Sequence, residues 1–359
     1  MQKIGRRSFL SAAAMTAAGS FAAGAAPKAA KGRCDLSGDV KFCVFADIHY
    51  SPGTFPHSTK EWLMKILEHA EQEKCDFIIH CGDFCHRPVQ DHEYVEVYNA
   101  FGSRIPVYHV IGNHDDDGNS HDETLSVYGM NSGHYFFERN GFRFVVLDPN
   151  HIRYADGRIE HYSNGNYYKK KKGDVISYVP PAQLAWLKTT LEESNLPCVL
   201  FSHQSLERPA GNSCSNNDEV RAIIDAANSA VPGKVRMAIN GHHHSDFHRI
   251  INGVTYFDLN SAHFYWIGSA YNNTHYPESF FVEHGMKPKP KVHWASYEYP
   301  LHAIVHMTGA GVINVKGTYS HYSLNVTPEM VGFVHDACGR IIPPSVSSFE
   351  VDMDFDQAT

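Results

Sequence analysis

Polar side chains that could bind or react with a ligand follow directly after short apolar runs of the sequence. The clearest case is the run Val107 to Ile111, which leads into Gly112-Asn113-His114-Asp115. An apolar run that stops at glycine is typical of a buried strand ending in a tight turn. Asn113 and Asp115 could simply cap such a turn. An amide, an imidazole and a carboxylate held together at a strand end are otherwise the groups of a reactive or ligand-binding site.

The same pattern recurs four more times. The other apolar runs end in Asp47-Ile48-His49, Gly82-Asp83, Ser202-His203 and Asn240-Gly241-His242-His243-His244. A lone histidine after a strand is usually a structural residue with a hydrogen-bonding partner. Five polar strand ends along one edge would bury many ionisable groups, which is costly without a cation. Carboxylates and imidazoles without thiolates favour borderline divalent or trivalent metals.

This series of motifs is similar to that of the calcineurin-like metallophosphoesterases. The resemblance covers Asp47 to His244, in the order that the family has. It implies two metal ions, of unspecified identity among Mn, Fe, Zn and Co. One ion would be held by Asp47, His49 and His244, the other by Asn113, His203 and His242, and Asp83 would bridge them with its two oxygens. His243 is left out, because in an extended segment its side chain points away from those of its neighbours.

The resemblance also implies how the site would work. Two adjacent ions can share a bridging hydroxide that attacks a phosphoryl group. His114 would act as general acid or transition-state stabiliser, and Asp115 is a candidate to orient it. The tyrosine that binds ferric iron in purple acid phosphatases is replaced here by His86. An iron–tyrosinate centre is therefore not expected, and we expect His86 and Cys85 to pack near the site.

The implied activity is metal-dependent hydrolysis of a small phosphoric ester. The motifs do not separate a phosphomonoester from a phosphodiester, because they concern the phosphoryl centre and not its substituents. A nucleotidase or diphosphatase is one alternative. Another is a non-catalytic metal- or ligand-binding protein on the same scaffold. That alternative predicts that a metal ligand or the acid is missing from the motifs. Neither is missing from this sequence. The oligomeric state stays open.

Helical patterns separate the apolar runs and determine how the polar residues are positioned. Residues 59–74, 92–101, 180–194 and 218–227 have amphipathic spacing. Alternating strands and helices predict βαβ units, in which ligands bind at the carboxyl ends of the strands. The family resemblance implies an α/β fold, a four-layer αββα sandwich of two mixed β-sheets flanked by helices. Residues 39–262 would form the catalytic core, and strands and pocket-rimming loops in residues 263–359 would complete the same domain and its second sheet.

Residues 148–179 form a long polar insertion that is rich in tyrosine. Segments of this length are usually functional or disordered. Its four consecutive lysines, Lys169 to Lys172, suggest either a solvated loop or a lid that attracts an anionic substrate. The aromatic residues of the insertion and of residues 264–266 could stack on a substrate or pack against each other.

The remaining features concern composition and destination. The chain has 359 residues and a formal net charge of −8, which argues against bulk nucleic-acid binding. Residues 1–30, with Arg6-Arg7-Ser8-Phe9-Leu10, resemble a bacterial twin-arginine signal and imply export to the periplasm or beyond. An uncleaved membrane anchor is the alternative, and no later stretch is apolar enough to span a bilayer. Four cysteines (43, 75, 81 and 198) should be reduced and buried, whereas Cys34, Cys214 and Cys338 are better placed to pair.

Overall fold

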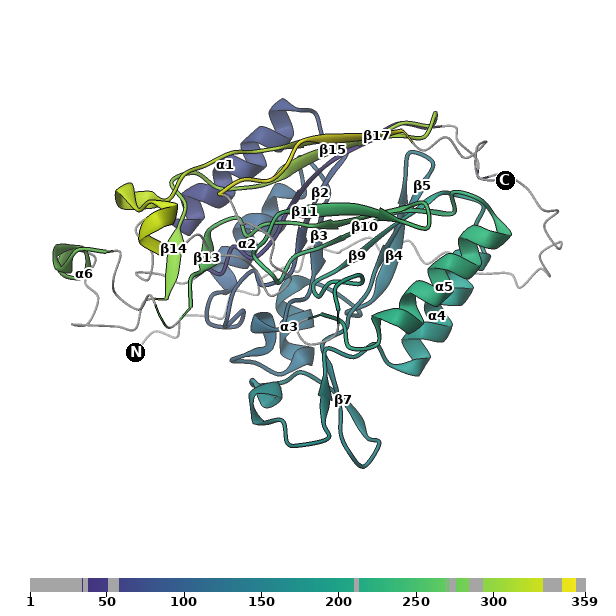
Figure 1. The fold of residues 1–359 in the computed structure, drawn as a ribbon, viewed down its shortest axis with the longest axis horizontal. Coiled ribbons are helices and arrows are strands. Elements are labelled where there is room, and N and C mark those ends of the chain that lie inside the picture. Colours follow the sequence, from purple (N-terminus) through teal and green to yellow (C-terminus); the bar gives the residue numbers. More distant parts are fainter. Residues whose placement is uncertain are drawn as a thin grey trace, which may run out of the picture. The chain divides into compact units, whose positions relative to one another are not determined.

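Two six-stranded sheets carry the polar strand ends (Figure 1). The computed structural model describes residues 34, 38–50, 58–209, 213–268, 270, 276–283, 293–331 and 344–352. The first sheet has the order β17-β16-β15-β1-β2-β3, with β1 (Val40–Phe45), β2 (Phe77–Cys81), β3 (Val107–Val110), β15 (Ala303–Met307), β16 (Val312–Gly317) and β17 (Phe349–Asp352). The second has the order β11-β12-β10-β9-β5-β4, with β4 (Tyr135–Arg139), β5 (Phe142–Val146), β9 (Cys198–Ser202), β10 (Val235–Asn240), β11 (Phe247–Ile251) and β12 (Val254–Asp258).

Both sheets are mixed, as expected. Strands β1, β2 and β3 are parallel in the first sheet, and β5, β9, β10 and β12 are parallel in the second. The outer strands pair antiparallel with them. The carboxyl ends of the parallel strands are therefore the places where the chain can bring its polar residues together.

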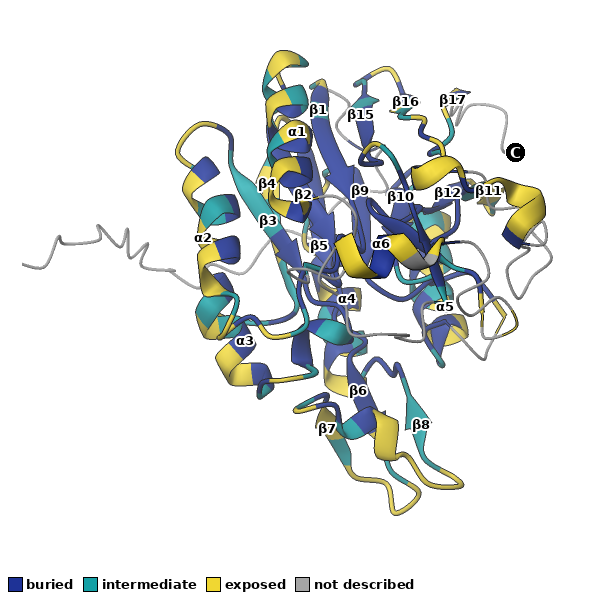
Figure 2. Ribbon diagram, turned by 90° about the vertical axis from the view of Figure 1, so that its left-hand side faces the viewer, coloured by how far each residue is buried: buried dark blue, intermediate teal, exposed yellow. Residues whose placement is uncertain are grey.

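Alternation along the strands explains the layers. Phe42 and Val44 of β1 face a core between the two sheets, whereas Cys43 and Phe45 face a second core under α1 (Thr59–Gln72) and α2 (His92–Phe101). A third core lies between the other sheet and the helices α4 (Pro181–Glu192) and α5 (Asn217–Ala230). Each helix is buried on one face only (Figure 2). The helix–sheet–sheet–helix order confirms the predicted αββα sandwich.

The C-terminal strands belong to one of the two large sheets. They extend the sheet that contains β1. Strand β15 pairs antiparallel with β1 on the side that β2 leaves open. Without β15, the buried strand β1 would present an unpaired edge.

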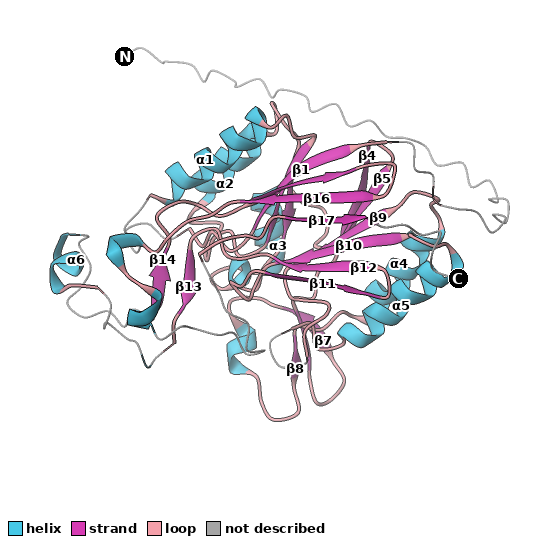
Figure 3. Cartoon of the chain, turned by 45° about the horizontal axis from the view of Figure 1, so that its top comes forward, coloured by secondary structure: helices cyan, strands magenta, loops and turns pink. Residues whose placement is uncertain are grey.

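Several elements were not predicted. Helix α3 (His121–Tyr128) begins with a capping box between Ser120 and Glu123 and ends at Gly129 in the left-handed region, two signals that are visible in the sequence. Residues 148–179 are not an irregular loop, because they contain a small sheet of three strands, β6 (His151–Arg153), β7 (Ile159–His161) and β8 (Val175–Ile176). The 3-10 turn η2 (Asn166–Lys169) lies between β7 and β8. Residues 264–296 likewise contain β13 (Phe264–Trp266), β14 (Trp294–Ser296) and the short helix α6 (Glu278–Glu283), beside the large sheets (Figure 3).

The cysteines and the possible membrane segment complete the description. All seven cysteines that the structure describes are free, including Cys34 and Cys214, for which pairing was expected. Cys338 and the signal-like residues 1–30 lie outside the described residues. Within the described part of the chain, no helix combines the length and apolar character that a bilayer crossing needs.

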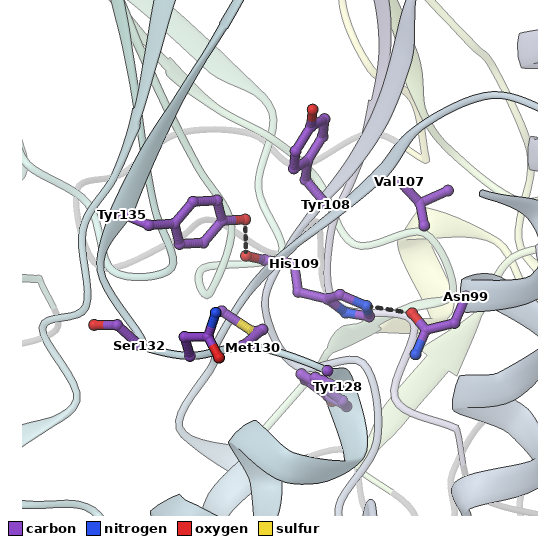
Figure 4. A pocket seen from close by; sticks show the side chains of 10 residues that line it. Asn99, Val107, Tyr108, His109, Tyr128, Met130, Ser132 and Tyr135 are labelled. Atoms are coloured by element: carbon purple, nitrogen blue, oxygen red, sulfur yellow. Dashed lines mark hydrogen bonds between the residues drawn. The ribbon is translucent and has the colours of Figure 1, made fainter. Parts of the chain in front are cut away.

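A pair of buried histidines links β2 and β3. Gly82 donates its backbone N–H to His80 Nδ1, and His80 Nε2 lies 2.7 Å from His109 Nδ1. His109 Nε2 in turn lies 2.7 Å from Asn99 Oδ1 (Figure 4). Each ring therefore needs only one proton to satisfy this series of bonds. Burial lowers the pKa of His109 to about 3 and that of His80 well below its usual value, so both rings are neutral at neutral pH.

We expect the free energy of unfolding to decrease as the pH falls from about 6.5 towards 4, because the unfolded chain takes up protons that this folded pair excludes. Each histidine contributes up to about 1.4 kcal/mol per pH unit. In urea unfolding of metal-stripped protein, His109→Gln should flatten this dependence, whereas substitution of the exposed His92 by glutamine should not. An unchanged slope in His109→Gln would contradict the neutral pair.

Candidate metal centre

The seven predicted ligands converge where the two sheets meet. In the first sheet, Asp47 and His49 follow β1, Asp83 follows β2, and Asn113 follows β3. In the second sheet, His203 follows β9, and His242 and His244 follow β10. All are buried except His242, which is half-buried. We call these seven residues the principal centre.

Left-handed backbone turns the ligands into the centre. Asp47, His49, Asp83, His242 and His244 have φ between 48° and 72°, a region that residues with a Cβ rarely adopt. Such strain persists where the surrounding structure enforces it, and it concentrates at functional sites. The segment around His243 is therefore not extended, so strand alternation is not the reason why His243 stands outside the ligand set.

The first group consists of Asp47, His49 and His244. His244 Nε2 lies 3.1 Å from His49 Nε2 and 3.3 Å from Asp47 Oδ1. The other ring nitrogen of His244, Nδ1, donates to the carbonyl of Phe264 at 2.8 Å. That bond fixes the tautomer and leaves the Nε2 lone pair facing the group, as in metal-binding histidines.

The second group consists of Asp83, His203 and His242, with Asn113 beside them. His203 Nε2 lies 3.1 Å from each of three atoms, Asp83 Oδ2, Asn113 Oδ1 and His242 Nδ1. His203 Nδ1 donates to the carbonyl of Cys81 at 2.8 Å, which again leaves Nε2 for the group. One nitrogen surrounded by three further possible metal-ligand atoms at these distances fits a shared cation better than a set of hydrogen bonds.

Asp83 lies between the two groups. Its Oδ2 is 3.7 Å from His49 Nε2 and 3.1 Å from His203 Nε2, whereas its Oδ1 accepts the backbone N–H of His114 at 2.8 Å. A single oxygen therefore faces both groups, which corrects the expectation that both oxygens bridge. Burial alone would raise the pKa of Asp83, but the neighbouring histidines, His203 first, hold it well below its usual range. For His203, burial lowers the pKa, but the charge of Asp83 outweighs the effect of burial and raises the pKa to about 9.

The partner of His114 is Asp117, not Asp115. His114 Nδ1 lies 2.6 Å from Asp117 Oδ2. Asp115 is fully buried, and its carboxylate accepts the hydroxyl of Tyr128 and the backbone N–H groups of Gly112, Phe84 and Cys85, at 2.7 to 3.0 Å. Asp115 thus ties the end of β2 to the turn after β3, and the orienting role that we expected of it belongs to its neighbour.

Two tyrosines of the insertion also reach this site. The Tyr167 hydroxyl donates to Asp117 Oδ1 at 2.7 Å and accepts from Asn113 Nδ2 at 3.0 Å. The Tyr168 hydroxyl lies 3.1 Å from Asp117 Oδ2 and 3.3 Å from His114 Nδ1. The sequence indicated aromatic residues near the site but gave no sign that these two hydroxyls would contact the predicted acid and one predicted ligand.

His86 makes polar contacts where packing was expected. His86 Nε2 lies 3.1 Å from His49 Nδ1, and His86 Nδ1 lies 3.4 Å from Asp117 Oδ2. Cys85 is fully buried, and its thiol contacts the Tyr128 hydroxyl at 3.7 Å, which fits the packing role expected for it. Asp117, with four polar neighbours at the site, is the functional residue that the sequence analysis missed.

The sandwich and its clusters of potential metal ligands define a metal-dependent phosphoesterase scaffold. Residues 40–246 match the calcineurin-like phosphoesterase family, and the chain belongs to that family. The match confirms the resemblance seen in the motifs. No curated protein sequence matches the chain.

Solved structures with the same fold are distant in sequence. A dimetal phosphatase from Danio rerio is 15% identical, with 77% of this chain and 95% of that one covered and a TM-score of 0.52. The anchor protein of the inner membrane complex of Plasmodium is 11% identical (85% and 89% covered, TM-score 0.47). A phosphatase from Mycoplasma pneumoniae is 13% identical (82% and 96% covered, TM-score 0.40).

We expect Asp117→Asn to lower kcat by about tenfold or more, part of the 10²–10⁴ that a positioned acid supplies. Burial lowers the pKa of His114, but the charges of Asp83 and Asp117 outweigh it and raise that pKa. A general acid must be protonated, so the alkaline limb of the pH–rate profile should move to lower pH when the Asp117 charge is removed. Rate measurements against pH check both effects.

Asp115→Asn is the matched comparison at the neighbouring position. It should lower the free energy of unfolding by about 3 kcal/mol, because it breaks several hydrogen bonds to a buried carboxylate. It should leave the alkaline limb in place. If Asp115→Asn moved that limb and Asp117→Asn did not, the assignment of the two aspartates would be wrong.

Proposed function

We propose that the chain hydrolyses a phosphoric ester with two metal ions held in the principal centre. The observation that carries this proposal is the position of Asp83, whose Oδ2 faces histidines of both groups, while each group combines residues that follow strands of both sheets. The first group would hold one ion and the second group, with Asn113, the other. Family membership and the dimetal phosphatase among the structural neighbours support the proposal.

The donor set fits two such ions. When bound, a pair of metal ions polarises a phosphoryl oxygen and lowers the pKa of a coordinated water towards neutrality. Imidazole and carboxylate donors without thiolate suit Mn, Fe, Zn or Co. The neutral amide of Asn113 limits the negative charge around an anionic substrate, and its Nδ2 is held by Tyr167 so that Oδ1 faces the second group.

The protein's own residues then handle the leaving group. With His114 Nδ1 committed to Asp117, Nε2 is the atom that can donate a proton to the departing alkoxide. Burial raises the pKa of Asp117, but its bonds to His114 and His86 outweigh burial and lower the pKa to about 2, so Asp117 stays ionised beside the acid. Tyr167 and Tyr168 hold the Asp117 carboxylate in place from the other side.

Removal and return of metal test the proposal directly. Chelator-stripped protein should not hydrolyse p-nitrophenyl phosphate or bis-p-nitrophenyl phosphate, and reloading with Mn, Fe, Zn or Co should restore turnover. Asp83→Asn should lose both ions and stay inactive after reloading, because both groups share this carboxylate. Substitution of the exposed Asp218 by asparagine is the control.

The relative turnover of the two compounds separates a monoesterase from a diesterase, and product analysis on nucleotides tests the nucleotidase or diphosphatase alternative. Two bound ions without turnover on any phosphoester would favour the non-catalytic binding protein. Full activity of metal-stripped wild type would exclude the metal-dependent mechanism.

We also propose that the protein is exported by the twin-arginine route, on the basis of Arg6, Arg7 and the apolar stretch after them. In a bacterium that has this route, the wild-type chain should appear in the periplasmic fraction. A variant with lysine at both positions should stay in the cytoplasm. Equal distribution of the two chains between fractions would argue against this signal.

A further inference from the structure

A second histidine–carboxylate cluster lies at the base of the insertion. It consists of His121 at the start of α3, Asp148 just after β5 and His161 at the end of β7, and we call it the insertion cluster. One ligand atom from each of these residues lies within 4.8 Å of the others. None of the three belongs to the principal centre, and neither the motifs nor the proposed function uses them.

Asp148 is the buried, charged member of the cluster. Only 1% of the residue is exposed. Its Oδ1 accepts the backbone N–H and the side-chain amide of Asn150, at 3.0 and 2.9 Å. Its Oδ2 has no hydrogen-bond partner within the described part of the chain. A buried carboxylate oxygen without a donor is costly, so the position calls for a ligand that the protein itself does not supply.

Two imidazole nitrogens face this oxygen at the distance expected for co-ligands. His121 Nε2 and His161 Nε2 each lie 3.7 Å from Asp148 Oδ2. That is too long for an N–H···O hydrogen bond. Two ligands bound to one zinc ion at about 2.0–2.1 Å with tetrahedral angles are about 3.3 Å apart. In the principal centre, the corresponding N···O distances run from 3.1 to 3.8 Å.

The tautomer of His121 is also that of a metal ligand. His121 Nδ1 lies 3.1 Å from Asp116 Oδ2, a fully buried carboxylate. This carboxylate–histidine bond directs the Nε2 lone pair towards Asp148. The ring of His161 stacks on that of His121 with centroids 3.9 Å apart, and on that of His151 at 4.0 Å.

We propose that His121, Asp148 and His161 form a further metal site, separate from the principal centre, that binds a borderline divalent cation such as Zn²⁺. Two imidazoles and one carboxylate with no thiolate match that class of ion. His161 is 45% exposed at its side chain, so solvent can supply the remaining coordination position. The bound ion would join β7 of the insertion to α3 and to the end of β5. It would thereby fix the part of the insertion that carries Tyr167 and Tyr168.

The test measures zinc bound per chain in a background without the principal centre. Full-length Asp83→Asn protein should retain one equivalent of Zn²⁺ after loading and desalting. The double variant Asp83→Asn, His161→Ala should retain no Zn²⁺ after the same treatment. Its affinity for Zn²⁺ should be lower by on the order of 100-fold, because loss of even an outer-shell partner of a metal ligand costs 10–100-fold in metal affinity. Zn²⁺ should raise the Tm of the first protein and not that of the second. His306→Ala, on β15 in the first sheet, is the matched control.

His161 is exposed enough for alanine to be tolerated, and circular dichroism verifies the fold. His161→Gln, which keeps a polar side chain, should behave like His161→Ala. Equal zinc content and equal Tm shift with and without His161 would overturn the proposal, as would a zinc-free Asp83→Asn protein. Failure of the dinuclear proposal would instead appear as the same zinc content in wild type and Asp83→Asn, and it leaves the effect of His161 unaltered.

Discussion

The buried carboxylate of Asp83 is the interaction on which the rest of the site depends. One of its oxygens faces histidines that follow strands of different sheets, and the other holds the backbone of His114. Moving this residue would therefore displace both ligand groups and the predicted acid together. A charge buried this deeply is tolerated only among compensating charges or a bound cation. The two sheets have to meet at a polar edge for that reason, although the core between them is apolar.

The same crowding explains the glycines that precede the ligands. A Cβ on Gly112 would lie 2.2 Å from Asp83 Oδ1, and one on Gly241 would lie 2.5 Å from Asp47 Oδ2. Both contacts are shorter than any real Cβ contact, so these positions need glycine because a ligand of a neighbouring strand occupies the space. Gly112 and Gly241 thus belong to the principal centre as much as the neighbouring ligands do, and this accounts for glycine at these two positions in terms of packing.

The sequence predicted the features that are set by local pattern. Apolar runs and helical spacing indicated the strands and helices around the centre, and the strand-end positions indicated which residues would converge there. It could not indicate which of three successive aspartates faces His114. The turn η1 (His114–Asp116) is a 3-10 turn, in which side chains three positions apart align, so Asp117 and not Asp115 lies beside the ring. It also could not place Tyr167, because that contact spans 54 residues and depends on how the insertion folds.

Three consecutive aspartates therefore serve three different neighbours from one short turn. Asp115 fastens the end of β2, Asp116 holds His121 of the insertion cluster, and Asp117 holds His114. The insertion bonds to this region as well, through the Gly165 N–H to the carbonyl of Asp116. Because the three carboxylates are adjacent along one 3-10 turn, the insertion cluster and the orientation of His114 depend on the same short stretch of backbone. The insertion is thus a structural part of the site, because its own hydrogen bonds reach both Asp116 and Asp117 of that turn.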